Sequence, residues 1–176
     1  PHFDHLGYEV AAGADAVVTG PQLGLSDFQM FLHRTARFDH HIHPAVEAGQ
    51  IPNGVHGSGV VEIGREVVLG ATRLRPFAEL RAGVEDLARI GIDLTVGPAG
   101  QGELLVRDSV SGHRYRTITN PVKGASFVAG ADIAKVWSSL YLPSATTTLT
   151  DARARVRAGL HWQGDAWAGF YGLNWL

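Results

Sequence analysis

The sequence lacks cysteine entirely and contains no long hydrophobic run. Zero cysteines among 176 residues exclude a disulfide framework, cysteine-ligated zinc and a thiol nucleophile in this sequence, and leave the redox compartment open. No stretch reaches the ~18 apolar residues that a transmembrane helix needs. If this chain crosses a membrane, it must therefore do so with strands.

Charge is also sparse and nearly balanced. Charged residues make up 18% of the chain against a usual ~25%, and 15 basic and 17 acidic side chains give a formal net charge of -2. No basic patch of the kind that binds phosphate backbones stands out. We therefore expect no nucleic-acid partner.

Apolar and polar residues alternate with a period of two over several long stretches. The pattern covers residues 8–18, 73–85, 89–97 and 154–162, and a period of two is typical of strands. The predicted outward, lipid-facing residues are Leu74, Leu80, Ile90, Ile92, Leu94, Val156 and Leu160. The predicted inward residues are Arg75, Glu79, Arg81, Asp93 and Arg155.

The length of these stretches favours a membrane barrel. A bilayer needs tilted strands of ~9 to 11 residues, and aromatic residues crowd the last third of the chain, as in interfacial girdles. We predict an all-β fold, an antiparallel transmembrane β-barrel of the outer-membrane type with about seven or eight strands in this chain. A soluble antiparallel sheet with one wet face stays open as the alternative.

One segment departs from the rhythm and predicts a short helix over residues 26–38. Ser26 is a suitable N-cap, Gln29 occupies the capping-box position, and His33 lies four residues further on the same helical face. A polar loop is expected to follow, to about Gly57, carrying four histidines at positions 40, 41, 43 and 56.

Gln29, His33 and Asp39 form the candidate catalytic group. An imidazole whose tautomer is held by a neighbouring polar group can act as a general base on water. The alternative is a histidine that is merely satisfied at the protein surface. The run from Asp39 to His43 has ligands enough for a metal such as zinc, but adjacent imidazoles rarely converge, and a solvated loop is the competing interpretation.

The arginines on the inward faces are a second candidate group. They could bind an anionic ligand, or they could pair with inward carboxylates, as buried charges require. The arginines are Arg73, Arg75, Arg81, Arg153, Arg155 and Arg157, and the carboxylates are Glu62, Glu66, Glu79, Glu85 and Asp93.

Several motifs together resemble a known family. They are the stretch 18–33 (VTGPQLGLSDFQMFLH), then 50–53 (QIPN), 102–108 (GELLVRD), 112–116 (GHRYR), 157–163 (RAGLHWQ) and 170–174 (FYGLN). They resemble the outer-membrane lipid A 3-O-deacylases of the LpxR type, and the likeness extends over nearly the whole chain. The segment that ends at His33 is its most specific part.

The resemblance implies a fold, an activity and a place in the cell. Members of that family are twelve-stranded barrels of the bacterial outer membrane that remove the 3-linked acyloxyacyl chain of lipid A by calcium-dependent hydrolysis. By resemblance, His33 is the general base, Gln29 lines the same site, and Asp39 stands where the family has an acidic residue that orients the histidine. Lipopolysaccharide and membrane lipids are the implied partners.

The sequence departs from the family in two ways. An early Asn-Asp pair, which supplies calcium ligands in the family, has no counterpart here, so we expect calcium ligands outside this chain. The expected strands are too few for twelve, so residues 1–176 are predicted to be a single barrel domain, an interior or C-terminal portion of a longer barrel. A non-catalytic outer-membrane barrel and a soluble lipid- or carbohydrate-binding sheet protein remain alternatives to the deacylase.

Overall fold

A computed structural model describes residues 2–5, 7–19, 28, 31, 32, 34–36, 54–101, 104–108, 111–118, 122–142 and 148–176. Their strands, in chain order, are β1 (His2–His5), β2 (Tyr8–Thr19), β3 (Gly54–Arg65), β4 (Val67–Leu69), β5 (Thr72–Ala82), β6 (Glu85–Val96), β7 (Leu104–Arg107), β8 (Arg114–Ile118), β9 (Gly124–Ser139), β10 (Arg153–Gln163) and β11 (Ala168–Trp175). Within the described ranges no helix is long and apolar enough to cross a membrane.

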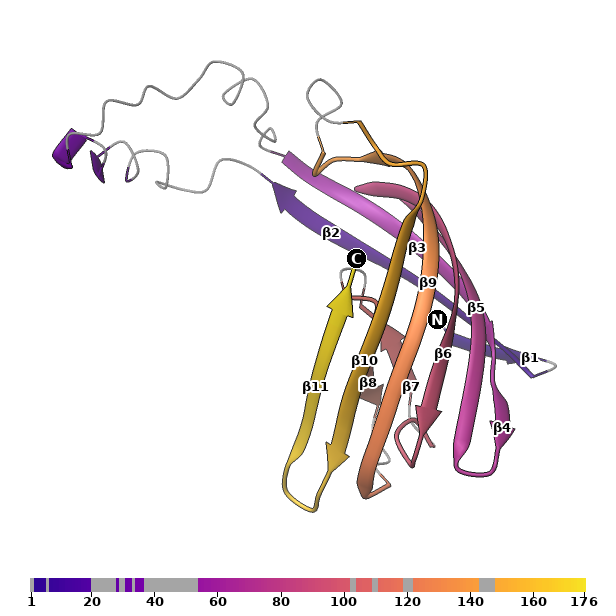
Figure 1. Ribbon diagram of the computed structural model, residues 1–176. Helices are drawn as coiled ribbons and strands as arrows, with labels where there is room; N and C mark the ends of the chain where they lie inside the picture. Colours follow the sequence, from indigo (N-terminus) through magenta and orange to yellow (C-terminus); the bar gives the residue numbers. More distant parts are fainter. Residues whose placement is uncertain are drawn as a thin grey trace.

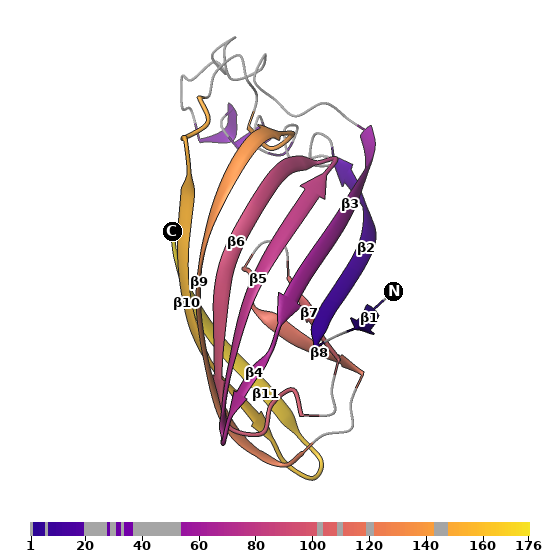
Figure 2. The ribbon, with the colours of Figure 1, turned by 90° about the vertical axis from the view of Figure 1, so that its right-hand side faces the viewer.

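Nine of these strands form one antiparallel sheet, and the other two form a separate hairpin. The sheet order is β1-β2-β3-β5-β6-β9-β10-β11, with β4 paired to β5, and β7 pairs with β8 alone. The sheet curls along its length, and the β7–β8 hairpin lies on the concave side of the curl (Figures 1 and 2). The prediction of an antiparallel barrel wall is thereby confirmed.

β3 and β4 behave as one strand with a short interruption. Gly64 pairs with Phe77, and Val67 pairs with Leu74, so the register against β5 is the same on both sides of the break. Pro76 lies opposite the interruption, and a proline has no N–H to donate to a ladder. The missing donor accounts for the local loss of pairing without a change of register.

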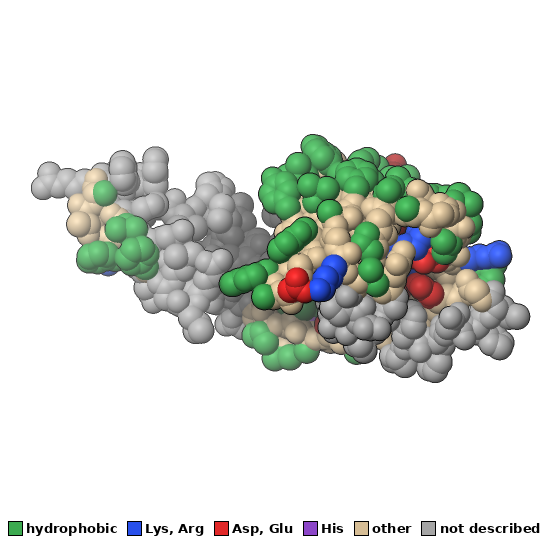
Figure 3. Space-filling view, turned by 90° about the horizontal axis from the view of Figure 1, so that it is seen from below, with side chains coloured by type: hydrophobic (Ala, Val, Ile, Leu, Met, Phe, Trp, Pro, Cys, Tyr) green, Lys and Arg blue, Asp and Glu red, His purple; other side chains and the backbone are tan. Residues whose placement is uncertain are grey.

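The alternation predicted from sequence sorts the side chains onto the two faces as expected. Leu80 is 63% exposed on the convex face, whereas Arg75 is 2% exposed on the concave face. Of the seven predicted outward residues, Leu74 and Leu94 are half-buried and the other five are exposed. Seen from below, apolar side chains gather along the outer margin (Figure 3). Within the described part of the chain no second sheet packs on the convex face. A soluble sandwich would have one there.

Two predictions of element boundaries were wrong. The stretch 73–85 is not one strand, because β5 ends at Ala82 and a two-residue turn, Gly83–Val84, leads into β6. Gly83 has a φ of 130°, which favours glycine, and its N–H donates to Asp86 Oδ1 at 2.9 Å. The polar loop expected to reach Gly57 is also shorter, since β3 begins at Gly54 and contains His56.

The β7–β8 hairpin was not among the strands predicted from the alternation. The predicted helix at 26–38 falls largely outside the described residues. Phe28, Phe31, Leu32, Arg34 and Thr35 within it have helical conformation, and the N–H of Ala36 donates to the carbonyl of Leu32 at 2.8 Å.

Candidate functional site

The concave face of the sheet carries a network of buried ion pairs. Arg75 Nη1 donates to Glu62 Oε1 at 2.7 Å, and Arg75 Nε donates to Glu9 Oε2 at the same distance. Arg89 Nη1 lies 3.2 Å from Glu79 Oε1. The second interpretation of the inward arginines is therefore confirmed, because they neutralise carboxylates of neighbouring strands.

Asp132 on β9 is the most heavily engaged carboxylate of the network. Arg89 Nε lies 3.3 Å from Asp132 Oδ1, Arg155 Nη2 lies 3.0 Å from Oδ2, and Arg157 also donates to Oδ2. Arg157 additionally pairs with Asp93. One carboxylate thus links guanidinium groups from β6 and β10, the two strands that flank β9 in the sheet.

Glycines on the inner face make room for these large side chains. A Cβ atom at Gly64 would overlap the guanidinium of Arg75, and one at Gly130 would lie 2.7 Å from Arg157 Nε. Gly91 is crowded from two strands, since its Cβ would lie 2.6 Å from the carbonyl oxygen of Ala131. The high glycine content is in part the packing requirement of an interior lined with arginine.

The β7–β8 hairpin contributes the centre of the network. Arg107 at the end of β7 donates to Glu62 Oε2 at 2.5 Å and to Asp93 Oδ2 at 2.6 Å. Its guanidinium also lies 3.6 Å from the centre of the Phe77 ring, a cation–π contact. Flanking carboxylates raise the pKa of Arg107 despite its burial.

Hydrogen bonds among described residues between β7 and β8 position the hairpin. The N–H of Ser111 donates to Asp108 Oδ2 at 2.5 Å, and Gly112 has a φ of 72°. The carbonyl of Gly112 accepts a hydrogen bond from Arg107 Nη1 at 2.9 Å. Arg107 therefore fixes the turn of its own hairpin as well as the contact with the sheet.

The hairpin contacts strands near both ends of the sheet order. Arg114 Nη2 lies 3.4 Å from Glu9 Oε2 of β2, whereas His113, just before β8, packs edge-on to Phe170 of β11 with ring centres 5.0 Å apart. Burial is the main cause that lowers the pKa of Arg114 to about 10, with repulsion from Arg75 next. Burial also lowers the pKa of His113, and a hydrogen bond to the backbone of Leu173 opposes that shift.

The three residues predicted to be catalytic, Gln29, His33 and Asp39, lie outside the described residues, as does the histidine run at 40–43. Their roles remain predictions. Sequence reasoning missed Arg107, Asp132 and Arg89, although GELLVRD and GHRYR, the motifs that flank the hairpin turn, were among those that carried the resemblance. The motif that contains Arg107 was noted in the sequence, but nothing in it indicated which residues Arg107 contacts.

The described residues do not fit a calcium ion. They contain no group of three or more His, Cys, Asp or Glu side chains placed to hold a metal. The buried carboxylates Glu62, Asp93 and Asp132 each accept from at least two guanidinium groups, so their oxygens are already engaged. No step of a reaction is assigned to a metal in this part of the chain.

A curled antiparallel sheet with an exposed apolar convex face and a charged concave face is the wall of an outer-membrane type of β-barrel. Comparison with solved structures agrees. The fold is similar to that of LpxR from Salmonella typhimurium, with a TM-score of 0.60, 15% sequence identity and coverage of 95% of this chain. The chain spans 60% of the length of that protein. No family model and no curated protein matches the sequence.

Proposed function

We propose that this chain is part of an outer-membrane lipid A deacylase that hydrolyses the 3-O-linked acyloxyacyl ester. One coincidence carries the proposal. The sequence motifs that end at His33 resemble the LpxR-type deacylases, and the fold of the chain is, independently, similar to that of LpxR over 95% of its length.

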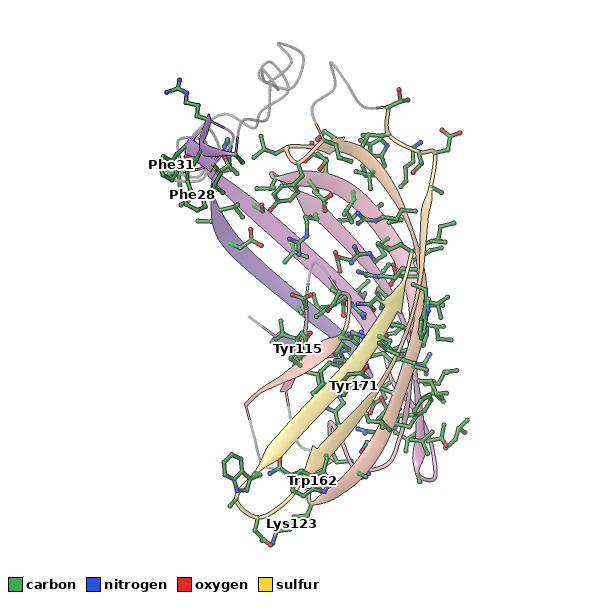
Figure 4. All side chains as sticks on the ribbon, turned by 60° about the vertical axis from the view of Figure 1, so that its left-hand side comes forward. Phe28, Phe31, Tyr115, Lys123, Trp162 and Tyr171 are labelled. Atoms are coloured by element: carbon green, nitrogen blue, oxygen red, sulfur yellow. The ribbon has the colours of Figure 1, made fainter. Side chains whose placement is uncertain are left out.

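The dimensions of the convex face support a place in the membrane. Phe127 and Trp137, both exposed, lie ten residues apart on β9. That separation is about 33 Å along a strand and about 25 Å along the membrane normal at a tilt of roughly 40°. Outer-membrane barrels have an apolar band of about this height between two aromatic girdles. Trp162 and Lys123 mark the lower rim in Figure 4.

The proposed chemistry needs few parts. Neutral His33 accepts a proton from water as the water oxygen attacks the ester carbonyl, which forms the new C–O bond. The bond to the sugar oxygen then breaks, the imidazolium of His33 returns its proton to that oxygen, and the products are a sugar hydroxyl and the acyloxyacyl carboxylic acid. Gln29 lines the site and Asp39 orients the imidazole, both by resemblance. Calcium enters the proposal by resemblance alone, with ligands outside the described residues.

The test is mass spectrometry of lipid A from bacteria that express the whole protein. Bacteria with the wild-type protein should contain lipid A that lacks the acyloxyacyl group. Bacteria with His33→Ala should contain no such deacylated lipid A, although the barrel still assembles. Asp39→Asn should reduce the yield less, because it perturbs the orientation of the base rather than the base itself.

His40→Ala is the matched control, a histidine in the same segment that the proposal leaves without a role. Loss of activity in His40→Ala with retention in His33→Ala would contradict the proposal and direct attention to the histidine run. An inactive wild type in assembled barrels would support the non-catalytic barrel instead. Removal of calcium by a chelator tests the cofactor separately from the base.

A further inference from the structure

The β7–β8 hairpin has no assigned role, although it occupies the concave side of the sheet. It is linked to the wall on both sides. Arg107 and Arg114 pair with Glu62, Asp93 and Glu9, on the half of the sheet that contains β2, β3 and β6. Figure 4 shows the hairpin, with Tyr115 labelled, between those strands and β11, on which Tyr171 is labelled.

On the other side the contacts are aromatic. Phe170 of β11 lies 5.0 Å from His113, 5.3 Å from Tyr115 and 4.4 Å from His161, measured between ring centres. Gly172 of β11 is held close beneath the His113 ring, since a Cβ there would lie 2.7 Å from Nε2. The hairpin therefore bridges from β2 to β11 across the concave face.

Two cavities flank the hairpin on the concave face. The cavity toward β9 and β10, lined by His113, Arg157 and His161, has a volume of about 30 Å³, enough for about one or two water molecules. The cavity toward β2 and β3, lined by Leu105, Arg114 and wall residues such as Val60 and Arg75, has about 210 Å³. Outer-membrane barrels that act as solute pores keep a polar, water-filled interior instead.

We propose that the hairpin is an internal plug that occludes the barrel interior, and that Arg107 is the latch that holds it against the wall. Arg107 is suited to this task, because it is 4% exposed in its side chain and bonds two wall carboxylates as well as the carbonyl of its own turn. The interior is then no route for solute. The inference does not rest on deacylase activity.

Site-directed labelling tests the plug directly, since this sequence has no cysteine. Leu105→Cys places a thiol in the partly buried layer between hairpin and wall. In the protein assembled in detergent or in outer-membrane vesicles, a polar maleimide should label this thiol slowly. Adding Arg107→Ala should speed labelling by roughly 100-fold, because removing one partner of a buried ion pair strongly weakens the contact.

The matched control is Arg153→Ala in the same Leu105→Cys background. Arg153 lies 3.7 Å from Glu85, at the rim opposite to the one that Trp162 and Lys123 mark. Its loss should therefore leave the labelling rate unchanged. Arg107→Lys keeps the charge and serves if Arg107→Ala fails to assemble; it should label at an intermediate rate. Fast labelling of Leu105→Cys alone, as fast as that of the exposed Ser138→Cys, would overturn the plug. An equal rate with and without Arg107 would overturn the latch.

A second measurement concerns transport. Liposomes that contain the whole wild-type protein should not swell in small sugars, whereas those that contain the Arg107→Ala protein should. Swelling with the wild type would overturn the proposal whether or not the protein deacylates lipid A.

Discussion

The convex and concave faces of the sheet carry opposite kinds of side chain and depend on different partners. Convex residues such as Ile90 and Leu160 are exposed and find no protein contact that buries them within the described part of the chain. Concave residues such as Arg89, 2% exposed, pair with carboxylates of the two neighbouring strands, Glu79 of β5 and Asp132 of β9. The convex face is therefore stabilised by its surroundings, and the concave face by charge complementarity inside the protein.

The largest expected effect comes from breaking the concave network. Asp132→Ala should lower the free energy of unfolding by about 3 to 5 kcal/mol, because Arg89, Arg155 and Arg157 lose a shared buried carboxylate. Asp15→Ala removes a pair of which the aspartate is 44% exposed and should cost under about 1 kcal/mol. Urea unfolding of the protein folded into detergent micelles measures both, and equal losses would contradict the comparison.

A charge on the convex face should cost somewhat less. Leu80→Arg is expected to destabilise by about 2 to 4 kcal/mol if this exposed residue lies near the bilayer midplane. Arg81→Gln, the neighbouring concave change, should cost less, because Glu79 keeps Arg89 at 3.2 Å. Reversible folding into lipid vesicles is the appropriate measurement. Equal tolerance of the two substitutions would argue against a bilayer around the convex face.

Glycine substitutions sharpen the comparison at smaller amplitude. Gly91→Ala should destabilise by roughly 1 to 3 kcal/mol, since the added methyl group would lie 2.6 Å from the Ala131 carbonyl and 2.7 Å from the Phe77 ring. Gly59→Ala, in β3, meets nothing within 4 Å and should be nearly neutral. A reversed order of the two midpoints of unfolding would show that the inner face is looser than described.

The smallest effect concerns pH. Burial lowers the pKa of His113 below its usual 6.5, so the folded state favours the neutral ring. This group therefore contributes stability that is present above about pH 6.5 and is lost as the pH falls toward the folded-state pKa. The midpoint of unfolding should therefore be lower at pH 5.5 than at pH 7.5. His113→Gln should make this difference smaller. An unchanged pH dependence would show that His113 is not involved.

The faces could be predicted from sequence because alternation is a local property of a strand. The residues between 154 and 162 alternate without exception, and the structure places β10 there with its arginines inward. The turn at Gly83–Val84 was missed because Val84 is apolar at the position where the alternation of β5 expects an apolar residue. In the structure Val84 is instead buried in the turn, where its N–H donates to Ser58 Oγ. β3 was missed because its first half, GVHGSG, contains three glycines, which are depleted in strands.

The interior site was only partly predictable for a different reason. That arginines would meet carboxylates follows from the cost of burying charge, but which ones meet depends on contacts between distant parts of the chain. Arg114 and Glu9 are 105 residues apart in sequence, and no local pattern encodes their contact. Gln29, His33 and Asp39 remain predictions that rest on the resemblance.

The reach of the hairpin also bears on the order in which the protein assembles. Wall strands pair with wall strands that come next in chain order. The hairpin instead contacts residues near both ends of the chain, from Glu9 to Leu173. Contacts of such long sequence separation form late, because the chain between them must be ordered first. We expect the hairpin to dock after β2 and β11 have joined the sheet, so that the interior arginines stay hydrated until the wall is nearly complete.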